Sequence, residues 1–592
     1  MKQIKLLLNI NLLFLFIAFH ISVSSLFLES QAVFYIATIT MLLLTSFYIK
    51  ELKLRSKADL FVMFLFLFIL SHLIIRGNEY GGYWIYTILL CWILFFVLKK
   101  IFYNDGYFLT YTFWLIVLGV YIEILLGFAQ LLGLLENNNN FFVLGGSLGN
   151  PGAYAGYLCV IFPFLLPFLF VYKSRKTGNA YYVLLMCLVF SFYLITVSFS
   201  RGAWIACFMS SFYVLNNHYE FRKNISLRIK KYLYKIPIIL SAIFLLSIVI
   251  YVLYSIKIDS IYGRLLIWKI SIITQHCNLL FGEGFGFFAA NYGHWQIDYF
   301  ASEVGSEYER YLADYVTCAY NEFLQILIEQ GLVGLTLWVI VFFLAFKRKN
   351  VYHSPFVVGS KASLIAMLVL SCVSYPFSIS LIYLHCIVCL AIIFHLPQKS
   401  DFKMVYSRRI YEKIVYSILS LSIVILGFYN LQALYWVREG QKAVFSNRIS
   451  EGLSLYNKSY PRVKNNGLFL FSYASALSLL EKYETAIEKL EIAAKKSSNP
   501  NIFILMGNNY RKMTMFEKAK NCYLNAIYSV PSRLYPKYLM VQLLVEMDQQ
   551  MEAYVWANEI LITKEKVSTN TAKIIKEEME SFLKNGILNS KK

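Results

Sequence analysis

Two arginines stand in strongly apolar sequence, and their surroundings give the first indication of chemistry. Arg201 lies in "TVSFSRGAWIACF" (196–208), between two apolar runs and next to Ser200 and Gly202. A charge in membrane-spanning sequence is costly and is usually retained for function. The side chain could instead extend to the lipid headgroups, but the tight Ser-Arg-Gly turn leaves little room for this. We therefore expect Arg201 to bind an anion, with Ser200 beside it.

A second arginine, Arg264, opens the segment "YGRLLIWKISIITQHCNLLFGEGFGFFAANY" (262–292). Arg264, Ile267 and Trp268 have helical spacing. The glycine-rich turn "GEGFG" (282–286) follows, but no strand is predicted before it, as a nucleotide-binding fingerprint would require. Two guanidinium groups on the same side of a membrane are suited to a diphosphate, which they bind through paired hydrogen bonds.

The composition indicates a protein with many membrane-spanning helices. Hydrophobic residues make up 58% of the chain and charged residues 15%, and soluble domains carry more charge than this. Apolar runs of bilayer length predict about thirteen spans. The first resembles a signal peptide without a clear cleavage site, and we interpret it as a retained helix. The predicted spans are 5–27, 31–49, 59–75, 83–98, 107–133, 154–172, 180–199, 202–216, 236–256, 321–346, 358–376, 378–396 and 413–435.

The net charge of +21 is explained by the loops between these spans. Basic residues concentrate in short connections that all fall on the side of Met1, as the positive-inside rule predicts for the cytoplasm. We therefore expect no nucleic acid partner. The long segment 257–320 falls on the other side and is acidic on balance. An odd number of spans places the C-terminus outside as well.

Histidine and cysteine do not form a convincing metal site. His385, Cys386 and Cys389 lie together in "HCIVC", inside a predicted span and without a second pair of ligands. We interpret them as packing residues, expect no metal or other cofactor, and see no disulfide framework.

After Trp436 the composition changes to that of a helical repeat. The segment 470–531 matches the tetratricopeptide pattern, with small residues that recur at a period of 33. The matching positions are Ala474, Ala486 and Ala493, followed by Gly507, Tyr510, Ala519, Ala526 and Pro531, with Ala553 in register and Gly440 and Gly452 in a degenerate earlier repeat. Such an array forms a concave peptide-binding surface. We expect it either to pack on the membrane domain or to dock a protein partner.

The predicted fold is therefore all-α: a polytopic helical membrane protein followed by a tetratricopeptide solenoid. We assign 1–436 to the membrane domain, with the long outer loop 257–320. The repeat domain occupies 437–565, and 566–592 forms a charged C-terminal helix or tail.

Five segments occur in an order that resembles the O-antigen ligase/polymerase family of polytopic glycan transferases. They are "GSLGNPGAYAGYLCVIFPF" (146–164), "SFSRGAW" (198–204), "GRLLIWKIS" (263–271), "LLFGEGFGFF" (279–288) and "AYNEFLQILIEQGLVGLTLW" (319–338). The resemblance covers roughly 140–345. It implies an enzyme of the bacterial cytoplasmic membrane, with the repeat domain in the periplasm. It further implies transfer of a glycan from an undecaprenyl diphosphate carrier to an acceptor on the periplasmic face, without metal or nucleotide.

The resemblance also implies a site. In this family one arginine from the Ser-Arg-Gly turn and another from the start of the long outer loop engage the carrier diphosphate, and Arg201 and Arg264 match these places. The family often has histidine where this chain has Tyr320, in "AYNEF". Tyrosine, with an ordinary pKa near 10, is a poor base at neutral pH. Tyr320 then positions the acceptor or is structural, and Glu322 is a candidate to accept the proton.

Other proton acceptors and ligands stay open. The loop histidines His276 and His294 could accept the proton, or no strong base is needed because arginines stabilise the departing diphosphate. Further candidate substrate-binding residues are Ser200, Trp268, Asn321, Asn150 and His294. Asn321 equally suits a helix cap, and Asn150 with Pro151 suits the first turn of the sixth span.

The acceptor is open among lipid A core, another glycan chain and a protein hydroxyl. An external repeat array favours contact with a protein, but it need not hold the substrate. A non-enzymatic flippase or transporter would also have many spans. Transport sites, however, lie near the bilayer midplane, whereas the notable polar residues here lie at the outer ends of the spans.

Overall fold

The computed structural model describes residues 6–13, 57–76, 84–137, 139, 141–174, 178–219, 258–273, 278–348, 354–395, 422, 425, 429, 431–566 and 569–589. Their regular secondary structure is helical, and no β-strand occurs in these ranges. The predicted spans 31–49 and 236–256 lie outside the described residues, as do most of 5–27 and 413–435.

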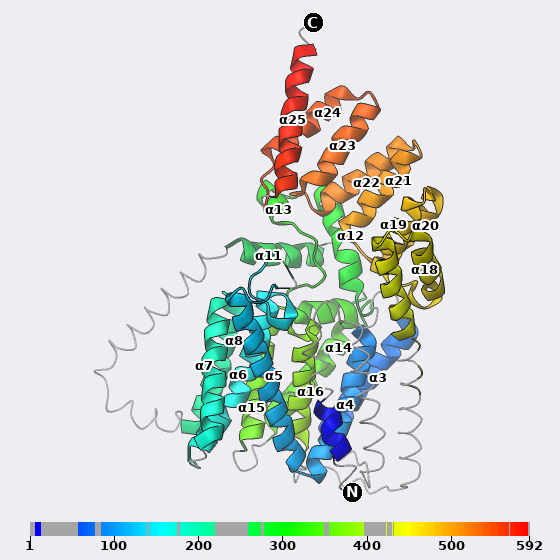
Figure 1. Cartoon of the computed structure of the whole chain (residues 1–592). Coiled ribbons are helices and arrows are strands. Elements are labelled where there is room, and N and C mark those ends of the chain that lie inside the picture. The colour runs from blue at the N-terminus through cyan, green and yellow to red at the C-terminus, as the bar shows by residue number, and fades with distance from the viewer. Residues whose placement is uncertain are drawn as a thin grey trace, which may run out of the picture.

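Nine described helices form a bundle at one end of the molecule (Figure 1). They are α3 (Lys57–Arg76), α4 (Trp84–Asn104), α5 (Tyr107–Leu131), α6 (Pro151–Ser174), α7 (Gly178–Val197), α8 (Arg201–Tyr219), α14 (Glu322–Lys347), α15 (Pro355–Ser371) and α16 (Ser380–Phe394). Among the described residues, five stretches are long and apolar enough to cross a membrane: Ala58–Ile75, Tyr107–Leu131, Pro151–Lys173, Gly178–Val197 and Glu322–Lys347. The chain is therefore a helical membrane protein.

Helix α6 lies at the centre of the bundle and packs on α7, α8 and α15. Its approach to α15 is close enough that a Cβ on Gly359 would lie 2.5 Å from the carbonyl oxygen of Phe164. His385 of α16 is buried beside them, with its Nε2 3.0 Å from Ser363 Oγ and 3.4 Å from Cys389 Sγ. These contacts fit the packing role predicted for the histidine and the cysteine.

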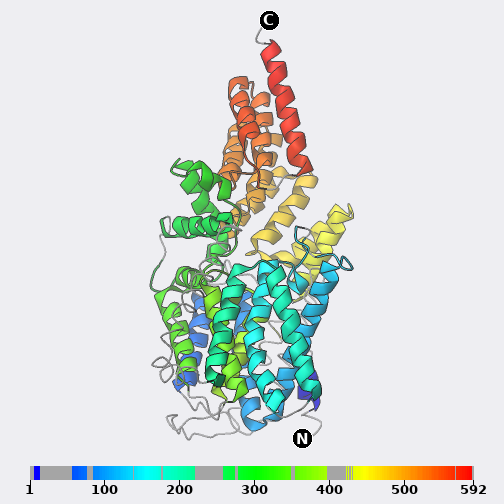
Figure 2. The same cartoon turned by 90° about the vertical axis from the view of Figure 1, so that its left-hand side faces the viewer.

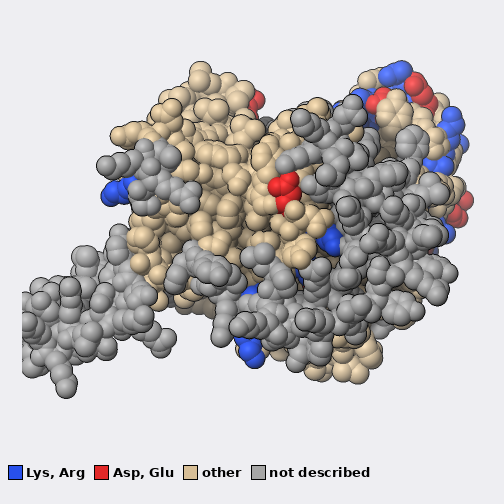
Figure 3. Space-filling view, turned by 90° about the horizontal axis from the view of Figure 1, so that it is seen from below, with Lys and Arg blue, Asp and Glu red and all other residues tan. Residues whose placement is uncertain are grey.

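The two ends of the bundle differ. The α4–α5 connection lies at the end away from the C-terminal helices, whereas the α7–α8 junction lies at the end beneath them (Figure 1). Viewed from the first end, the described surface is mostly uncharged, with scattered Lys and Arg and a few Asp or Glu side chains (Figure 3). The Ser-Arg-Gly turn and the α4–α5 connection, which follows Lys99 and Lys100 of α4, are thus at opposite ends.

Helix α14 is kinked at Gly331, whose φ of 68° is in the left-handed region. The interruption lets the turn before α12 bond to the backbone of α14. The amide of Leu332 donates to the Leu279 carbonyl at 2.8 Å, and that of Val333 donates to the Leu280 carbonyl at 3.1 Å. This splice fixes the outer segment to the end of the bundle.

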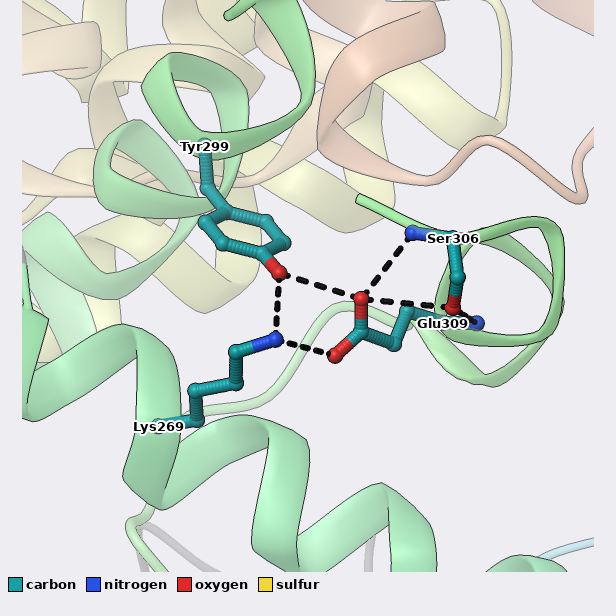
Figure 4. Close-up of polar contacts among 4 residues, drawn as sticks. All are labelled: Lys269, Tyr299, Ser306 and Glu309. Atoms are coloured by element: carbon teal, nitrogen blue, oxygen red, sulfur yellow. Dashed lines mark hydrogen bonds and ion pairs between the residues drawn. The ribbon is translucent and has the colours of Figure 1, made fainter. Parts of the chain in front are cut away.

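The outer segment contains α11 (Ile258–Ile273), α12 (Phe287–Ala301) and α13 (Glu307–Leu312), between the bundle and the C-terminal helices (Figures 1 and 2). One polar network joins its three helices (Figure 4). Lys269 of α11 donates to Tyr299 of α12 at 2.7 Å and to Glu309 of α13 at 2.6 Å. Ser306 and Glu309 form a capping box at the start of α13. The network fixes α11 relative to α12 and the first turn of α13.

The C-terminal helices form a stack of antiparallel pairs that runs away from the bundle (Figures 1 and 2). They are α18 (Ile449–Val463), α19 (Gly467–Leu479), α20 (Tyr483–Lys496), α21 (Pro500–Lys512), α22 (Phe516–Ser529), α23 (Leu534–Glu546), α24 (Gln550–Ile562) and α25 (Asn570–Asn589). Four tight turns each contain one non-glycine residue with positive φ, and successive ones are 33 or 34 residues apart: Asn447, Glu481, Thr514 and Asp548.

Small residues allow the close approach of these helices. The predicted alanines Ala474, Ala486, Ala493, Ala519, Ala526 and Ala553 are all fully buried. A Cβ on Gly440 would lie 2.6 Å from the ring of Tyr456, and Gly507 stands in similar contact with Tyr523. Helix α25 packs on α23 and α24.

The stack packs on α12 of the outer segment. The amide of Gly293 donates to Ser498 Oγ at 3.1 Å, and His294 Nε2 is 2.8 Å from the Ala494 carbonyl oxygen. Gln296 donates to the carbonyl of Ser529. The sequence left open whether these helices pack on the membrane domain or dock a protein partner, and this contact with its outer segment does not exclude docking.

Candidate active site

A tight turn places Arg201 at the first position of α8. Phe199 has a φ of 52°, a conformation that costs a non-glycine residue energy and is found often at functional sites. Ser198 Oγ donates to the Ile195 carbonyl at 2.6 Å, and Trp204 Nε1 donates to the same oxygen at 2.8 Å. The Ser200 carbonyl accepts from Trp204 N at 3.1 Å and so begins the helix.

The first turn of α8 lies against the end of α15. A Cβ on Gly202 would be 3.2 Å from Val373 Cγ2. The chain then continues through Tyr375 into the short 3-10 helix η5 (Pro376–Ser378). Arg201 is therefore held between α7, α8 and the α15–α16 connection.

Arg264 projects from α11 toward the same place. Burial lowers its pKa, and the positive charge of Arg201 lowers it further, so the two guanidinium groups are within electrostatic reach. The Arg264 Cζ atom is 5.4 Å from the centre of the Tyr320 ring, which is a cation–π distance. The structure thus brings together two arginines and a tyrosine from three separate segments.

Tyr320 is fixed by its neighbours on both sides. Its φ is 51°, and its ring meets that of Tyr375 edge-on at 5.2 Å. Trp268 Nε1 donates to the Ala319 carbonyl at 2.8 Å. Burial is the main cause that raises the pKa of Tyr320 to about 12, and the charge of Arg264 opposes the rise. The phenol is therefore protonated at neutral pH.

A cavity of about 450 Å³ opens over Arg264 and Tyr320. Tyrosine rings, carboxylates, an amide and two cations line it: Asp259, Arg264, Tyr292, Gln296, Tyr311, Asp314, Tyr315, Tyr320 and Lys566. Asp259 accepts a hydrogen bond from Tyr308 at 2.7 Å, and Asp314 lies 3.3 Å from Lys566. Aromatic faces with a few placed polar groups are typical of a site for an organic ligand. We call this space the outer cavity.

Glu322 lines a different space. It is buried at the start of α14, where its Oε1 accepts a hydrogen bond from the amide of Phe377 at 2.8 Å. It borders a cavity of about 280 Å³ with Gln325 and Glu329. The carboxylate therefore joins α14 to η5, and it is not among the residues that line the outer cavity.

Two predicted residues act as helix caps. Asn321 Oδ1 accepts from the amide of Leu324 at 3.1 Å at the start of α14, which is the capping alternative named for it. Asn150 Oδ1 accepts from the amide of Gly152 at 2.8 Å and so forms the first turn of α6, as predicted. Asparagine is favoured at both positions because its side chain satisfies an amide that the helix leaves open.

Neither of the two predicted loop histidines is found at the outer cavity among the described residues. His294 lies at the contact between α12 and the C-terminal helices and does not line the outer cavity. His276 lies outside the described residues.

Sequence reasoning missed Tyr375 and Lys566. A signal existed for Tyr375, because it stands in the break "SYPFS" between two apolar runs. Lys566 carries no comparable signal, since it is one of two lysines in a polar connection.

Residues 186–339 match a family model described as O-antigen ligase. The matched range contains Arg201, Arg264, Tyr320 and Glu322 and ends inside α14. No curated protein matches the chain. The match supports the resemblance to the ligase family, and with it a glycosyltransferase-type activity on lipid-linked glycans in a membrane protein.

Proposed function

We propose that this chain transfers an oligo- or polysaccharide from an undecaprenyl diphosphate carrier to an acceptor hydroxyl on the periplasmic face of the membrane, as an O-antigen ligase or polymerase does. One observation carries the proposal: Arg264 lines the outer cavity and is within electrostatic reach of Arg201, and both lie inside the region that matches the ligase family model.

The diphosphate lies between the two arginines in this proposal. Two guanidinium groups held close repel each other, and a bound anion relieves the repulsion. The first turn of α8 adds the positive end of the helix dipole, which favours an anion at the same place. The lipid tail then lies between bundle helices, and the first sugars occupy the outer cavity.

The reaction is a displacement at the anomeric carbon. The acceptor oxygen forms the new bond to this carbon, and the bond to the diphosphate oxygen breaks with its electron pair. The arginines stabilise the charge that grows on the diphosphate. The acceptor proton goes to Glu322, to another nearby acceptor or to the departing diphosphate. A single displacement inverts the anomeric centre, and no metal or nucleotide cofactor is proposed.

Tyr320 positions the acceptor and is not the sole base. We expect Tyr320→Phe to retain part of the transfer activity and Tyr320→His to be tolerated, because departure of the diphosphate carries much of the reaction. A general base contributes roughly 100- to 10,000-fold, so the loss in Tyr320→Phe is expected to be smaller than that. Glu322→Gln tests, in the same assay, the carboxylate that the sequence indicates as a proton acceptor.

The pH profile separates the roles. With a pKa raised to about 12, a tyrosinate base would make the rate rise tenfold per pH unit up to that pH. We expect no such rise in the wild type when transfer is measured from a purified lipid-linked glycan. Complete loss in Tyr320→Phe, together with normal activity in Glu322→Gln, would show that the tyrosine is the base.

We place the protein in the bacterial cytoplasmic membrane, with 1–436 as the membrane domain, 437–565 as a tetratricopeptide domain and 566–592 as its terminal helix. The alternation of basic loops over thirteen spans puts the repeat domain in the periplasm. A reporter that is active only in the periplasm, fused after Lys592, is therefore expected to be active. Activity of a cytoplasmic reporter alone would show that the span count is wrong by one.

The acceptor divides the proposal into branches. Ligases use lipid A core, polymerases use another glycan chain, and protein O-oligosaccharyltransferases use serine or threonine. The helical stack favours the protein branch as the alternative, since such arrays dock peptides. Mass spectrometry of the glycoconjugates in a deletion strain separates these branches.

A glycan transporter is the second alternative. It moves the intact lipid-linked glycan, whereas a transferase releases free carrier diphosphate. Purified protein with the lipid-linked glycan and an acceptor tests this directly: we expect release of undecaprenyl diphosphate and a glycosylated acceptor.

A further inference from the structure

Lys566 joins the C-terminal helices to the outer cavity. It lies in the connection between α24 and α25, and its ammonium donates to the carbonyls of Leu312 at 2.7 Å and Ala313 at 3.0 Å. The same group pairs with Asp314 at 3.3 Å. All three donors of the ammonium therefore have acceptors on one short stretch of the outer segment.

The segment after α13 depends on contacts with other parts of the chain to hold its position. Residues 313–320 lead from α13 to Tyr320 without forming a helix. The last carbonyls of a helix have no partner within it, and a lysine is favoured there by charge and by hydrogen bonding. Lys566 occupies this position at the end of α13, although it belongs to a distant part of the chain.

Two neighbouring contacts fasten the same stretch. Lys564 Nζ is 4.9 Å from the centre of the Tyr311 ring. Gln296 of α12 donates both to the Asp314 carbonyl and to the carbonyl of Ser529 in α22. The segment over Arg264 is thus held from two sides, and both contacts involve the C-terminal helices.

We infer that the α24–α25 connection closes one side of the outer cavity through Lys566 and that Lys566 is a positioning residue for the segment 312–316. The stack is then part of the donor site, in addition to any role in docking an acceptor or a partner protein. The effect on transfer rests on the proposed function, whereas the effect on the segment does not.

The consequence for catalysis is specific. Lys566 lines the cavity, and Tyr320 is held independently by Arg264 and Tyr375. Loss of Lys566 therefore loosens the part of the cavity that receives the sugar and leaves the arginine pair in place. We expect KM for the lipid-linked donor to rise about tenfold and kcat to change by less than about threefold. This pattern is expected when the lost interaction stabilises the bound substrate and the transition state equally.

The test uses the full chain and two readouts. The variants are Lys566→Met, the conservative Lys566→Arg, and Lys573→Met as a matched control for an exposed lysine on α25. Hydrogen–deuterium exchange of peptides covering 310–320 reports on the segment without reference to activity. Loss of charge-assisted hydrogen bonds is expected to speed exchange about tenfold in Lys566→Met. The arginine variant and the Lys573 control should resemble the wild type.

The outcomes are distinct. An exchange rate over 310–320 that is unchanged in Lys566→Met overturns the inference. So does an exchange rate in the Lys573→Met control that rises as much as in Lys566→Met. Faster exchange with an unchanged donor KM also overturns it, because the segment would then not shape the donor site. Faster exchange in a protein whose wild type transfers no glycan supports the positioning role and shows that the proposed function itself has failed.

Discussion

Replacement of Arg264 by lysine is expected to reduce glycan transfer by about 100-fold or more, while the protein still inserts and accumulates. Lysine keeps the positive charge but loses the planar two-point contact with phosphate oxygens. It also replaces the planar guanidinium that faces the Tyr320 ring with a smaller ammonium group. Removal of one donor that stabilises a departing oxyanion costs about 100- to 1,000-fold in other enzymes.

Arg201→Lys is expected to behave in the same way, because both guanidinium groups face one ligand in this account. Arg533→Lys, on the C-terminal helices, is the matched control and should transfer normally. Accumulation is measured in the membrane fraction, and transfer is measured with a purified lipid-linked donor. Near-normal transfer by both lysine variants at Arg201 and Arg264 would refute the role assigned to them.

Gly331→Ala is expected to prevent accumulation or to lower the unfolding temperature strongly. Gly331 has a φ of 68°, and an added Cβ would lie 2.5 Å from the carbonyl carbon of Leu280. The obstacle is backbone, so no side-chain rotation relieves it. The left-handed conformation and the overlap together cost about 3 kcal/mol or more.

Gly156→Ala is the matched control. A Cβ on Gly156, in α6, would be 3.6 Å from the nearest atom of Ile382, an ordinary contact, so this variant should be tolerated. Thermal unfolding of the detergent-solubilised protein compares the two. A wild-type unfolding temperature in Gly331→Ala would mean that the splice between the turn before α12 and α14 does not stabilise the protein.

Hydropathy located several bundle helices well, since bilayer-length apolar runs have few competing explanations. Helix α5, predicted over 107–133, is Tyr107–Leu131, and α7, predicted over 180–199, is Gly178–Val197. Hydropathy failed at the end of α15, which was predicted to reach 376 and ends at Ser371. Tyrosine, proline and phenylalanine continue the apolar run, although Pro376 begins the separate helix η5. Tyr375 was missed for this reason.

In the candidate site, too, some features could be predicted from local sequence and others could not. The caps formed by Asn150 and Asn321 depend on neighbouring residues, so a local pattern contains them. The convergence of Arg201 and Arg264 followed from a resemblance and a topology, not from spacing. The contact of Lys566 with the segment after α13 depends on how the helical stack lies on α12, and no local pattern encodes that arrangement.

The central claim is that Arg201 and Arg264 together hold a diphosphate. Binding of undecaprenyl diphosphate to the purified full-length protein in nanodiscs tests it most directly, with undecaprenyl monophosphate as the comparison ligand. We predict that each lysine variant weakens diphosphate binding about tenfold, that the double variant weakens it further, and that the monophosphate binds the wild type less tightly. Equal affinity of the wild type and the double variant for the diphosphate would contradict the account.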